Sequence, residues 1–422
     1  MAGECGQLSV GLSWVGIGYL DVAEQETKLL VFTSLFPSKV QPRAGLFIRE
    51  RMFRVGKHLP LVVVSPVPWF PLQGLIRYFK PAYRLQPPKL EQQQGVMVYH
   101  PRFLAVPGVL RRLDGLSMAL CSLFLLLRLK RSFKFTLIDS HFAWPDGYGA
   151  TLLGRWLRVP VTITLRGTEV PHSKDSVKRT KILLSLRRAA RVFAVADSLK
   201  RHVVALGANA AKIQVVGNGV DTERFIRENQ VEARERFNLP VHAQVLVTVG
   251  GLVERKGFHR VIELMPALLE EFPRLYYLVV GGACAEGDWR ERLENQASEL
   301  GVRDRVLFTG AVVPDELRWP LSAADIFVLP TSNEGWANVF LEAMACGLPV
   351  VTSDVGGNPE VICNDELGTI VPFGDSQCLL KAIVAALNKE WQREEIITYA
   401  KNNSWDHRVE HLLTAFAEIK EP

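Results

Sequence analysis

Cysteine is scarce in this chain of 422 residues, and no two of its six cysteines form a C-x-x-C pair. Without such a pair, or a histidine at a matching spacing, the sequence has no zinc-binding pattern. It also lacks the dense cysteine framework of a small secreted protein. We therefore expect reduced thiols and a cytoplasmic location.

Long apolar runs are lacking too. A membrane-spanning helix needs about 20 consecutive apolar residues, and the longest run here, Leu116–Leu127, falls well short of that. A second run, Val10–Leu20, has no basic residue ahead of it. Because a signal peptide requires a positively charged start and a small-residue cleavage site, we interpret residues 1–27 as a poorly ordered extension.

What the chain does have is a charge asymmetry, concealed by a net charge of +6. Residues 1–212 contain 31 Lys and Arg against 12 Asp and Glu, whereas the remainder contains 19 against 32. A basic half favours an anionic partner such as a membrane surface, a lipid diphosphate or an acidic polysaccharide. Nucleic acid fits the charge but not the motifs, and an ordinary solvated basic surface is the plain alternative.

Short apolar runs alternate with helix-like stretches along the chain, which predicts parallel α/β sheets. The expected strands are Lys28–Ser34, Leu61–Ser65, Thr136–Ser140, Val161–Leu165, Val192–Val195, Ile213–Val216, Gln244–Val249, Tyr276–Val280, Val306–Phe308, Ile326–Leu329 and Val350–Thr352.

The alternation restarts after a connection near residue 220. We predict an N-terminal domain over residues 28–220 and a C-terminal domain over residues 221–404, each a Rossmann-like doubly wound sheet. Ligands bind such sheets beyond the carboxyl ends of the strands, so two facing domains enclose a cleft. An amphipathic helix over residues 405–422 lies outside both alternations and is expected to pack back on the first domain.

The segment Asn333–Gly357 is the most informative one, reading N-E-G-W-A-N-V-F-L-E-A-M-A-C-G-L-P-V-V-T-S-D-V-G-G. An N-cap at Ser332 or the next residue and a stop at Gly347 predict a helix of about ten residues. Its N-terminus would offer free N–H groups and a positive dipole end to a phosphate. With Glu334 and Glu342 beside it to hold hydroxyl groups, the segment indicates a sugar nucleotide.

A basic loop, Gly250–Gly257, follows the expected strand Gln244–Val249 and reads G-G-L-V-E-R-K-G. Its glycines allow close backbone approach, and Arg255 or Lys256 can neutralise a diphosphate without a metal. The loop is neither a P-loop nor a G-x-G-x-x-G fingerprint. Taken alone, it is equally well a basic surface turn.

Taken together, these segments resemble the retaining glycosyltransferases of family 4, which have the GT-B fold. Glu334 and Glu342 match that family's pair of glutamates separated by seven residues, and E-R-K-G matches its basic loop. The resemblance covers residues 28 to about 420. Four further matches are V-G-N-G-V-D-T-E-R-F at Val216–Phe225, L-V-V-G-G at Leu278–Gly282, V-L-F-T-G at Val306–Gly310 and D-V-G-G-N-P-E at Asp354–Glu360.

The resemblance implies that residues 28–220 form the acceptor-side domain and that residues 221–404 bind the nucleotide sugar. It also implies roles for individual residues of the second half. Glu334 is expected to be catalytic and to hold a hydroxyl of the donor sugar, and Glu342 is expected to bind the ribose hydroxyls. Many family members have arginine where this chain has Gly251, so Arg255 is expected to assume part of that role. The donor diphosphate is expected to be bound by two side chains and four backbone amides, those of Arg255, Lys256, Trp336, Ala337, Asn338 and Val339.

Loops of the first half resemble the family more loosely. Gly45 follows the first strand, where the family keeps a glycine near the donor phosphates. His141 ends a strand and is expected to face the donor sugar as a second catalytic residue, although a lone histidine is more often structural. Arg166 stands where the family commonly has histidine, and we assign it to donor binding with its contact left open.

The resemblance implies a reaction that retains anomeric configuration by front-face displacement, in which the departing phosphate itself accepts the proton of the acceptor. That differs from the paired carboxylates of retaining glycosidases. The chain has no D-x-D metal anchor, so we expect neither a metal nor a cofactor. We expect a UDP- or GDP-sugar donor and a lipid-linked or polysaccharide acceptor of the cell surface. The alternatives are a soluble transferase acting on a small sugar or metabolite, a sugar-nucleotide epimerase on the same fold, and a non-enzymatic binding protein.

Two segments of the first half are candidates for contact with the inner face of the cytoplasmic membrane. Val64–Leu72 combines prolines with aromatic residues and precedes Arg77, Lys80 and Arg84. It is either a membrane or acceptor loop or a proline-rich connection. Leu123–Leu127, which basic residues follow, belongs either to a buried sheet-covering helix or to an interfacial one.

Overall fold

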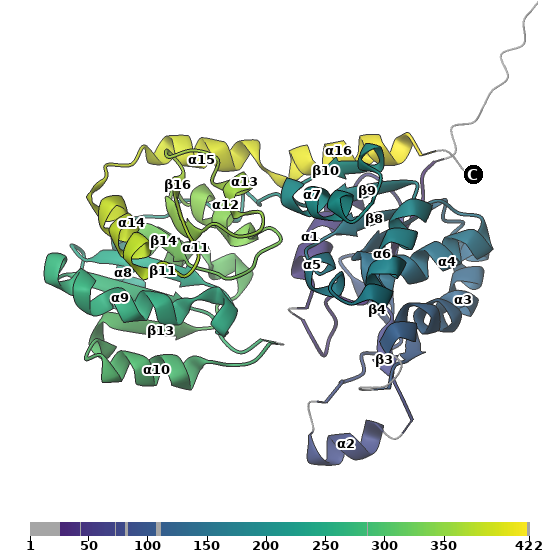
Figure 1. Ribbon diagram of the computed structural model, residues 1–422, viewed down its shortest axis with the longest axis horizontal. Coiled ribbons are helices and arrows are strands. Elements are labelled where there is room, and N and C mark those ends of the chain that lie inside the picture. The colour runs from purple at the N-terminus through teal and green to yellow at the C-terminus, as the bar shows by residue number, and fades with distance from the viewer. Residues whose placement is uncertain are drawn as a thin grey trace, which may run out of the picture.

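The computed structural model describes residues 26–42, 44–71, 73–80, 83–106, 111–284 and 286–419. The extension expected over residues 1–27 lies outside these ranges except for its last two residues. Two α/β domains stand side by side, and the last two helices run along one side of the molecule from the second domain onto the first (Figure 1). In the described part of the chain, no helix is both long enough and apolar enough to cross a membrane.

The first domain is built on an eight-stranded sheet of order β10-β9-β8-β7-β1-β2-β5-β4, parallel except for the pair β4 and β5. The hairpin of β4 and β5 was not expected from the sequence. The strands are β1 (Leu29–Phe32), β2 (Leu61–Val64), β4 (Leu90–Gln93), β5 (Val96–Tyr99), β7 (Leu137–His141), β8 (Val161–Leu165), β9 (Arg191–Ala194) and β10 (Ile213–Val215).

Helices cover both faces of this sheet because its strands are apolar on both sides. In β1, Leu30 and Phe32 face one apolar cluster with α3, α4, α6 and α7, while Leu29 and Val31 face another with α1 and α16. The helices are α1 (Leu46–Val55), α3 (Asp114–Ser132), α4 (Tyr148–Leu157), α5 (Glu169–His172), α6 (Ser176–Arg188), α7 (Asp197–Ala205) and, from the C-terminus, α16 (Trp405–Ala417).

The second domain has a six-stranded, fully parallel sheet of order β13-β12-β11-β14-β15-β16. Every strand expected in this half is present. The strands are β11 (Gln244–Val249), β12 (Leu275–Val280), β13 (Val306–Gly310), β14 (Ile326–Leu329), β15 (Val350–Ser353) and β16 (Gly368–Val371). The predicted class, two Rossmann-like α/β domains, is confirmed.

Its helices also pack on both faces of the sheet. One apolar cluster includes α8, α11, α12 and α15, and the other includes α9, α10 and α14. The helices are α8 (Gln230–Arg236), α9 (Phe258–Glu271), α10 (Arg290–Glu299), α11 (Arg318–Ala323), α12 (Asn338–Ala345), α13 (Asn358–Val361), α14 (Ser376–Asn388) and α15 (Arg393–Asn402).

The chain crosses between the domains twice, and the two crossings are hydrogen-bonded to each other. Val220 donates to the carbonyl of Asn403 (3.2 Å), and Trp405 donates to the carbonyl of Val220 (3.1 Å). Gly219 is required at this point, since a Cβ there would lie 2.5 Å from the Trp405 nitrogen. Beyond the crossing, α16 buries Leu412 and Phe416 against the first sheet.

Candidate functional site

A cavity of about 700 Å³ lies between the two domains. Its walls are largely loops at the carboxyl ends of parallel strands, where doubly wound sheets bind ligands. The first domain contributes residues that follow β1, β7, β8 and β9, namely Leu35, Phe142, Arg166 and Val195. The structure brings nine of the eleven predicted site residues into this wall: Arg166, Arg255, Lys256, Glu334, Trp336, Ala337, Asn338, Val339 and Glu342.

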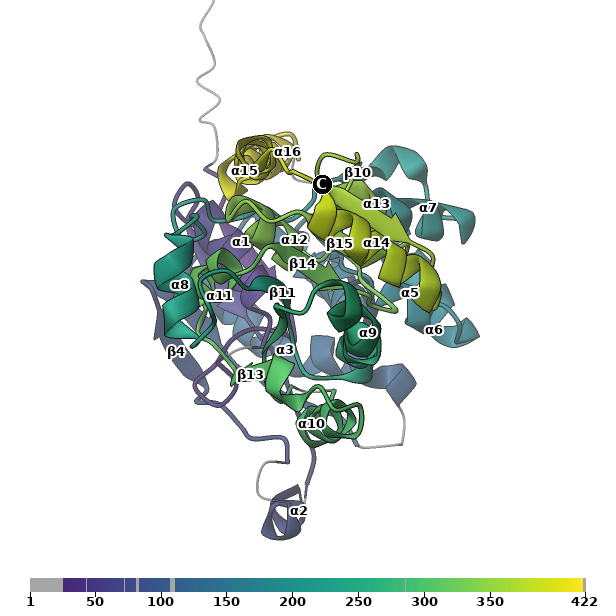
Figure 2. The same cartoon turned by 90° about the vertical axis from the view of Figure 1, so that its left-hand side faces the viewer.

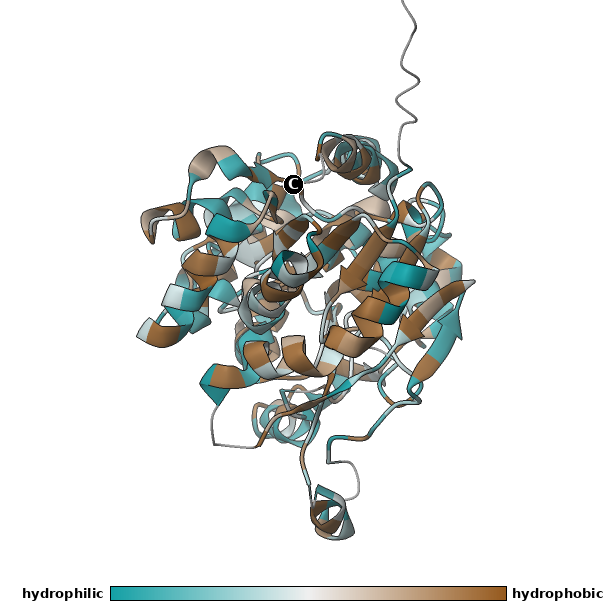
Figure 3. Cartoon of the chain, turned by 90° about the vertical axis from the view of Figure 1, so that its right-hand side faces the viewer, coloured by the Kyte–Doolittle hydropathy of each residue, from teal (hydrophilic) through white to brown (hydrophobic). Residues whose placement is uncertain are grey.

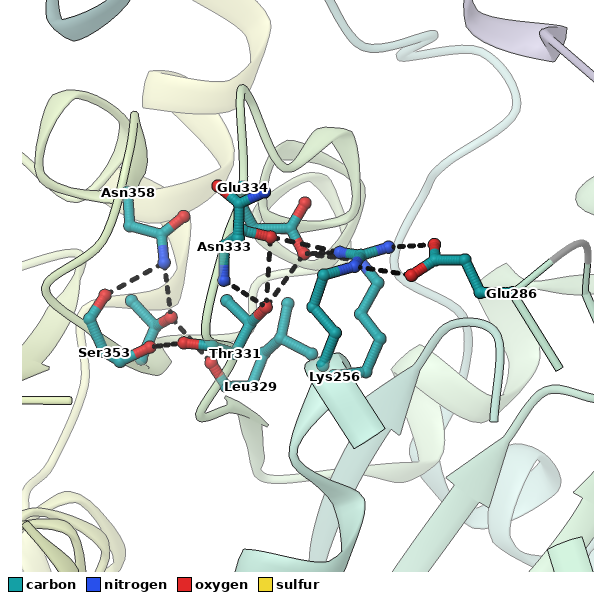
Figure 4. Close-up of polar contacts among 10 residues, drawn as sticks. Lys256, Glu286, Leu329, Thr331, Asn333, Glu334, Ser353 and Asn358 are labelled. Carbon is teal, nitrogen blue, oxygen red and sulfur yellow. Dashed lines mark hydrogen bonds and ion pairs between the residues drawn. The ribbon is translucent and has the colours of Figure 1, made fainter. Parts of the chain in front are cut away.

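Glu334 is the centre of a charged cluster in the cavity (Figure 4). Its Oε1 accepts hydrogen bonds from Lys256 Nζ (2.6 Å), Arg255 Nη1 (3.1 Å) and Thr331 Oγ1 (3.1 Å). Both cations come from the loop after β11, so this contact joins two loops of the same domain. The second carboxylate oxygen makes no such contact within the described residues and remains available to a hydroxyl group.

Glu286 is a cavity residue that the sequence reasoning missed. Its two oxygens accept from Arg255 Nη2 (2.6 Å) and Nε (3.0 Å), which fixes the plane of the guanidinium group. The hydrogen bond from Arg255 lowers the pKa of the Glu286 carboxyl. No local motif marks this residue, because its partner is 31 positions away along the chain.

The space beside Gly251 is too small for a larger residue such as arginine. A Cβ on Gly251 would lie 2.8 Å from Cys284 Sγ, so a larger residue there requires the loop around Cys284 to shift. Arg255, four residues further along the same loop, also lines the cavity. That it assumes part of the role of the missing arginine stays a prediction.

Helix α12 begins later than the sequence predicts. It runs from Asn338 to Ala345, with Ala337 at the N-cap position, whereas Ser332 or Asn333 was expected to be the cap. The intervening residues form a loop that presses on the first domain: a Cβ on Gly335 would lie 2.6 Å from the Arg166 carbonyl oxygen. Tertiary contact therefore overrides the local cap signals. The first turn of α12 has no side-chain cap and faces the cavity.

Glu342 lies one turn into α12 and is largely buried in the cavity wall. Burial raises the pKa of its carboxyl to about 7, and the nearby Arg224 opposes part of this shift. No described side chain donates a hydrogen bond to it. A ligand with hydroxyl groups would supply the missing hydrogen-bond donors.

Arg166 occupies the wall position that was expected for His141. His141 is fully buried at the end of β7; Arg166 Nε donates to its Nδ1 (3.2 Å), and Asp139 Oδ2 lies 3.5 Å from its Nε2. Burial and the Arg166 charge hold the pKa of His141 well below its usual range, so the ring is neutral. The expectation that His141 faces a donor sugar is therefore corrected: an arginine stands between the ring and the cavity.

The Arg166 guanidinium is fixed by its neighbours. Its Nη1 donates to Asn218 Oδ1 (3.1 Å), and its Cζ lies 4.9 Å from the centre of the Phe47 ring. Asn218 Nδ2 in turn donates to Asn338 Oδ1 (2.8 Å) at the start of α12. This chain of contacts links the first domain to the helix that faces the cavity.

Glu169 is a second residue whose role emerges only in the structure. Its buried carboxylate accepts from the backbone nitrogens of Ala143 (3.0 Å), Arg166 (3.2 Å) and Gly167 (2.9 Å). It thus fixes the loop that carries Arg166. Glu169 lies only three residues after Arg166, in the segment T-L-R-G-T-E, but no role was predicted for it from the sequence.

Gly45 is not among the described residues that line the cavity. It has a left-handed backbone (φ 67°), and a Cβ there would lie 2.4 Å from the Leu35 carbonyl oxygen. Gly45 allows the start of α1 to pack on the loop that carries Leu35, and Leu35 is the cavity residue. The expected contact of Gly45 with donor phosphates stays a prediction.

Several direct contacts join the two domains. The Glu360 carboxylate of the second domain accepts from the backbone nitrogen of Ser198 (2.8 Å) and from that of Asp197, at the start of α7 in the first domain. Trp336 packs against Gly217 and contributes to the apolar clusters of both domains. Among the described residues, no group of three His, Cys, Asp or Glu is arranged to hold a metal ion.

Comparison with known proteins places both domains in one family. The profile "Glycosyltransferase Family 4" matches residues 59–224, and "Glycosyl transferases group 1" matches residues 229–403. TuaC of Bacillus subtilis (strain 168), a glycosyltransferase named for teichuronic acid biosynthesis, is 29% identical over 376 residues, which cover 87% of this chain and 91% of TuaC. The D-inositol 3-phosphate glycosyltransferase of Corynebacterium efficiens is 30% identical over 68% of this chain and 72% of its own length.

Solved glycosyltransferase structures share the fold of this chain. The crystal structure of Anabaena HepE in complex with UDP superposes with a TM-score of 0.71 at 18% identity, covering 93% of this chain and all of HepE. At that identity the likeness shows the fold alone. The matches to both domains and the relatives together establish that this chain is a glycosyltransferase of family 4 with the GT-B fold.

Proposed function

We propose that this enzyme transfers a sugar, with retention of anomeric configuration, from a UDP- or GDP-sugar to a lipid-linked or polysaccharide acceptor of the cell surface. One observation carries the proposal: the cavity combines a free helix N-terminus, two cations and two separate carboxylates on one wall. The name of TuaC and the UDP bound to HepE agree with this assignment. We further propose that the acceptor is met at the inner face of the cytoplasmic membrane, through the basic first half.

The proposed roles follow from position. The first amides of α12, with Lys256 and Arg255, would bind the diphosphate and stabilise the charge that develops as it departs. Glu334 would hold a sugar hydroxyl with its free oxygen while its other oxygen keeps the two cations in place. Glu342 would accept the ribose hydroxyls.

The distribution of carboxylates supports displacement on one face. All carboxylates among the described cavity residues, Glu286, Glu334 and Glu342, belong to the second domain. The first domain contributes no carboxylate to the described wall that would attack from the opposite face. In the proposed reaction, the bond from the anomeric carbon to the donor phosphate breaks, the acceptor oxygen bonds to that carbon, and its proton passes to the leaving phosphate.

A donor screen tests the proposed function. Purified protein is incubated with UDP- and GDP-sugars, and released UDP or GDP is measured with and without lipid extract from a bacterial envelope. We expect slow release from at least one donor alone and faster release with the extract. No release from any nucleotide sugar under either condition would contradict the proposal.

The affinity for the nucleotide should depend on pH through Glu342. Its carboxyl, with a pKa raised to about 7, must ionise to accept two ribose hydroxyls, so the affinity for UDP or GDP should rise about tenfold between pH 6 and pH 8. Glu342→Gln should bind more weakly and lose this dependence, as followed by calorimetry. Glu270→Gln, exposed on α9, is the matched control.

Although Glu342→Gln should weaken nucleotide binding, it should make the folded protein more stable at high pH. The unfolded chain releases the Glu342 proton near pH 4.5 and the folded protein near pH 7, so stability falls as pH rises through this window. At pH values above 7, Glu342→Gln should therefore have a higher unfolding temperature than the wild type. Below pH 4.5 the two unfolding temperatures should be equal. Equal midpoints at pH 8 would contradict the burial of this carboxylate.

Glu286 should act through Arg255. We expect Glu286→Gln to weaken UDP or GDP binding two- to fivefold, the scale of a partly exposed ion pair, and to leave binding of the nucleoside monophosphate unchanged. In an Arg255→Ala background the substitution should have no further effect. Glu291→Gln, exposed on α10, is the control. Tighter binding of the diphosphate would instead identify Glu286 as a competitor for Arg255.

A further inference from the structure

We propose that the described residues between 67 and 89, here named the α2 arm, bind the surface of an anionic lipid bilayer beside the mouth of the cavity. The arm comprises β3 (Val67–Trp69), α2 (Gln73–Phe79) and the segment 83–89 that leads to β4. The inference deepens the proposed function, because it names the surface that would meet a lipid-linked acceptor.

The arm starts at the cavity edge of the first domain. It leaves the sheet at the carboxyl end of β2, and β2 is parallel to β1, which is parallel to β7. The loops after β1 and β7 line the cavity with Leu35 and Phe142. The helix α2 projects below the rest of the chain in two perpendicular views (Figures 1 and 2).

One face of α2 is apolar and exposed. Leu75, Tyr78 and Phe79 have relative exposures of 65%, 84% and 81%, and their i, i+3, i+4 spacing places them on one side of the helix. The rings of Tyr78 and Phe79 lie 5.3 Å apart, edge to face. Figure 3 shows the apolar stretch of α2 at the tip of the molecule. No other described part of the chain covers this face.

The arm carries positive charge and is braced from within. Residues 67–89 contain Arg77, Lys80, Arg84 and Lys89 but no Asp or Glu. Arg77 donates to the carbonyls of Tyr83 (3.2 Å) and Arg84 (3.2 Å), and Arg84 donates to the carbonyl of Ala105 (2.6 Å). Carbonyl groups hold these guanidinium groups in place without neutralising them. The tip is therefore both cationic and ordered.

An anionic bilayer fits this combination better than a second copy of the chain. Two α2 arms in contact would bring their unneutralised cations together, at an electrostatic cost. A bilayer interface offers anionic head groups to the cations and an apolar layer to Leu75 and Phe79, and tyrosine is favoured at such a boundary. At seven residues α2 is about 10 Å long, which suits a helix that lies in the interface.

Sedimentation with vesicles tests this inference on the full chain. We expect binding to vesicles of equal parts phosphatidylcholine and phosphatidylglycerol, and little binding to phosphatidylcholine alone. The triple variant Leu75→Ser, Tyr78→Ser, Phe79→Ser should lose at least about tenfold in partitioning. Lys80→Glu should weaken binding only to the anionic vesicles. The double variant Val313→Ser, Phe373→Ser, at exposed positions of the second domain, is the control and should bind like the wild type.

Three results would overturn the proposal: equal binding of the triple variant and the wild type, equal loss in the second-domain control, or a change of oligomeric state in the triple variant that identifies the arm as a contact between copies. Nucleotide binding separates this proposal from the proposed function. The triple variant should keep the wild-type thermal shift with UDP or GDP. A wild type that binds vesicles but no nucleotide would leave the arm standing and refute the donor assignment.

Discussion

Replacing Glu334 by Ala is expected to lower kcat for sugar transfer by about 10²- to 10³-fold, with the affinity for the nucleoside diphosphate changed by less than about threefold. The variant would lose the proposed contact between the Glu334 carboxylate and a sugar hydroxyl, and we expect this contact to be strongest in the transition state. It would also release Lys256 and Arg255, which it holds at 2.6 and 3.1 Å. Steady-state transfer and calorimetry with UDP or GDP measure the two effects separately.

The matched control is Glu270→Ala, an exposed glutamate on α9. It should leave both quantities at the wild-type value. Equal losses of nucleotide affinity and turnover in Glu334→Ala would mean that this residue serves the nucleotide and not the sugar. Full activity would remove it from the site altogether.

Lys256→Ala should lower kcat by a similar factor, about 10²- to 10³-fold, because in the proposed reaction the ammonium group stabilises the departing diphosphate. The Lys256 side chain is largely buried and lines the cavity together with the uncapped start of α12. Unlike the Glu334 variant, it should also bind UDP or GDP about tenfold more weakly. The affinity for the corresponding nucleoside monophosphate should change much less.

Lys401→Ala, exposed on α15, is the control for the loss of a positive charge. It should retain turnover and affinity. If Lys256→Ala weakens the monophosphate and the diphosphate alike, the lysine contacts the nucleoside side of the ligand, and the assignment of the basic loop is wrong.

The strands could be predicted because each signal is local. A run such as Leu29–Phe32 is apolar on both faces, as only a central strand covered by helices on both sides requires. The donor half of the site was accessible for the same reason: Glu334, Glu342 and the basic loop lie in short segments, so their spacing survives in the sequence.

What escaped prediction depends on contacts between distant segments. The cap expected at Ser332 failed because Gly335 presses on the backbone of Arg166 in the other domain. Glu286 has no motif of its own and is defined by its distance from Arg255. His141 was assigned from its place at the end of β7, but the side chain of Arg166 covers it.

The hairpin of β4 and β5 shows the same limit on a smaller scale. Its turn contains Gln94 (φ 48°) and Gly95 (φ 85°), a combination that favours a tight hairpin. The edge strand β4, Leu90–Gln93, is mostly polar (L-E-Q-Q), so a search for apolar runs passes over it. The strand β5, Val96–Tyr99, is apolar (V-M-V-Y) but only four residues long, and it lacks the helix-like stretch that follows the expected strands.

A thermal-shift measurement with UDP, GDP and ADP tests the central claim, that the cavity between the domains binds the nucleotide of the donor through Glu342 and Lys256. Binding to the folded state raises the unfolding midpoint by mass action. The wild type and Lys401→Ala should both respond to UDP or GDP, and Glu342→Gln and Lys256→Ala should respond much less. No response of the wild type to any of the three nucleotides, or an undiminished response in both cavity variants, would contradict the claim.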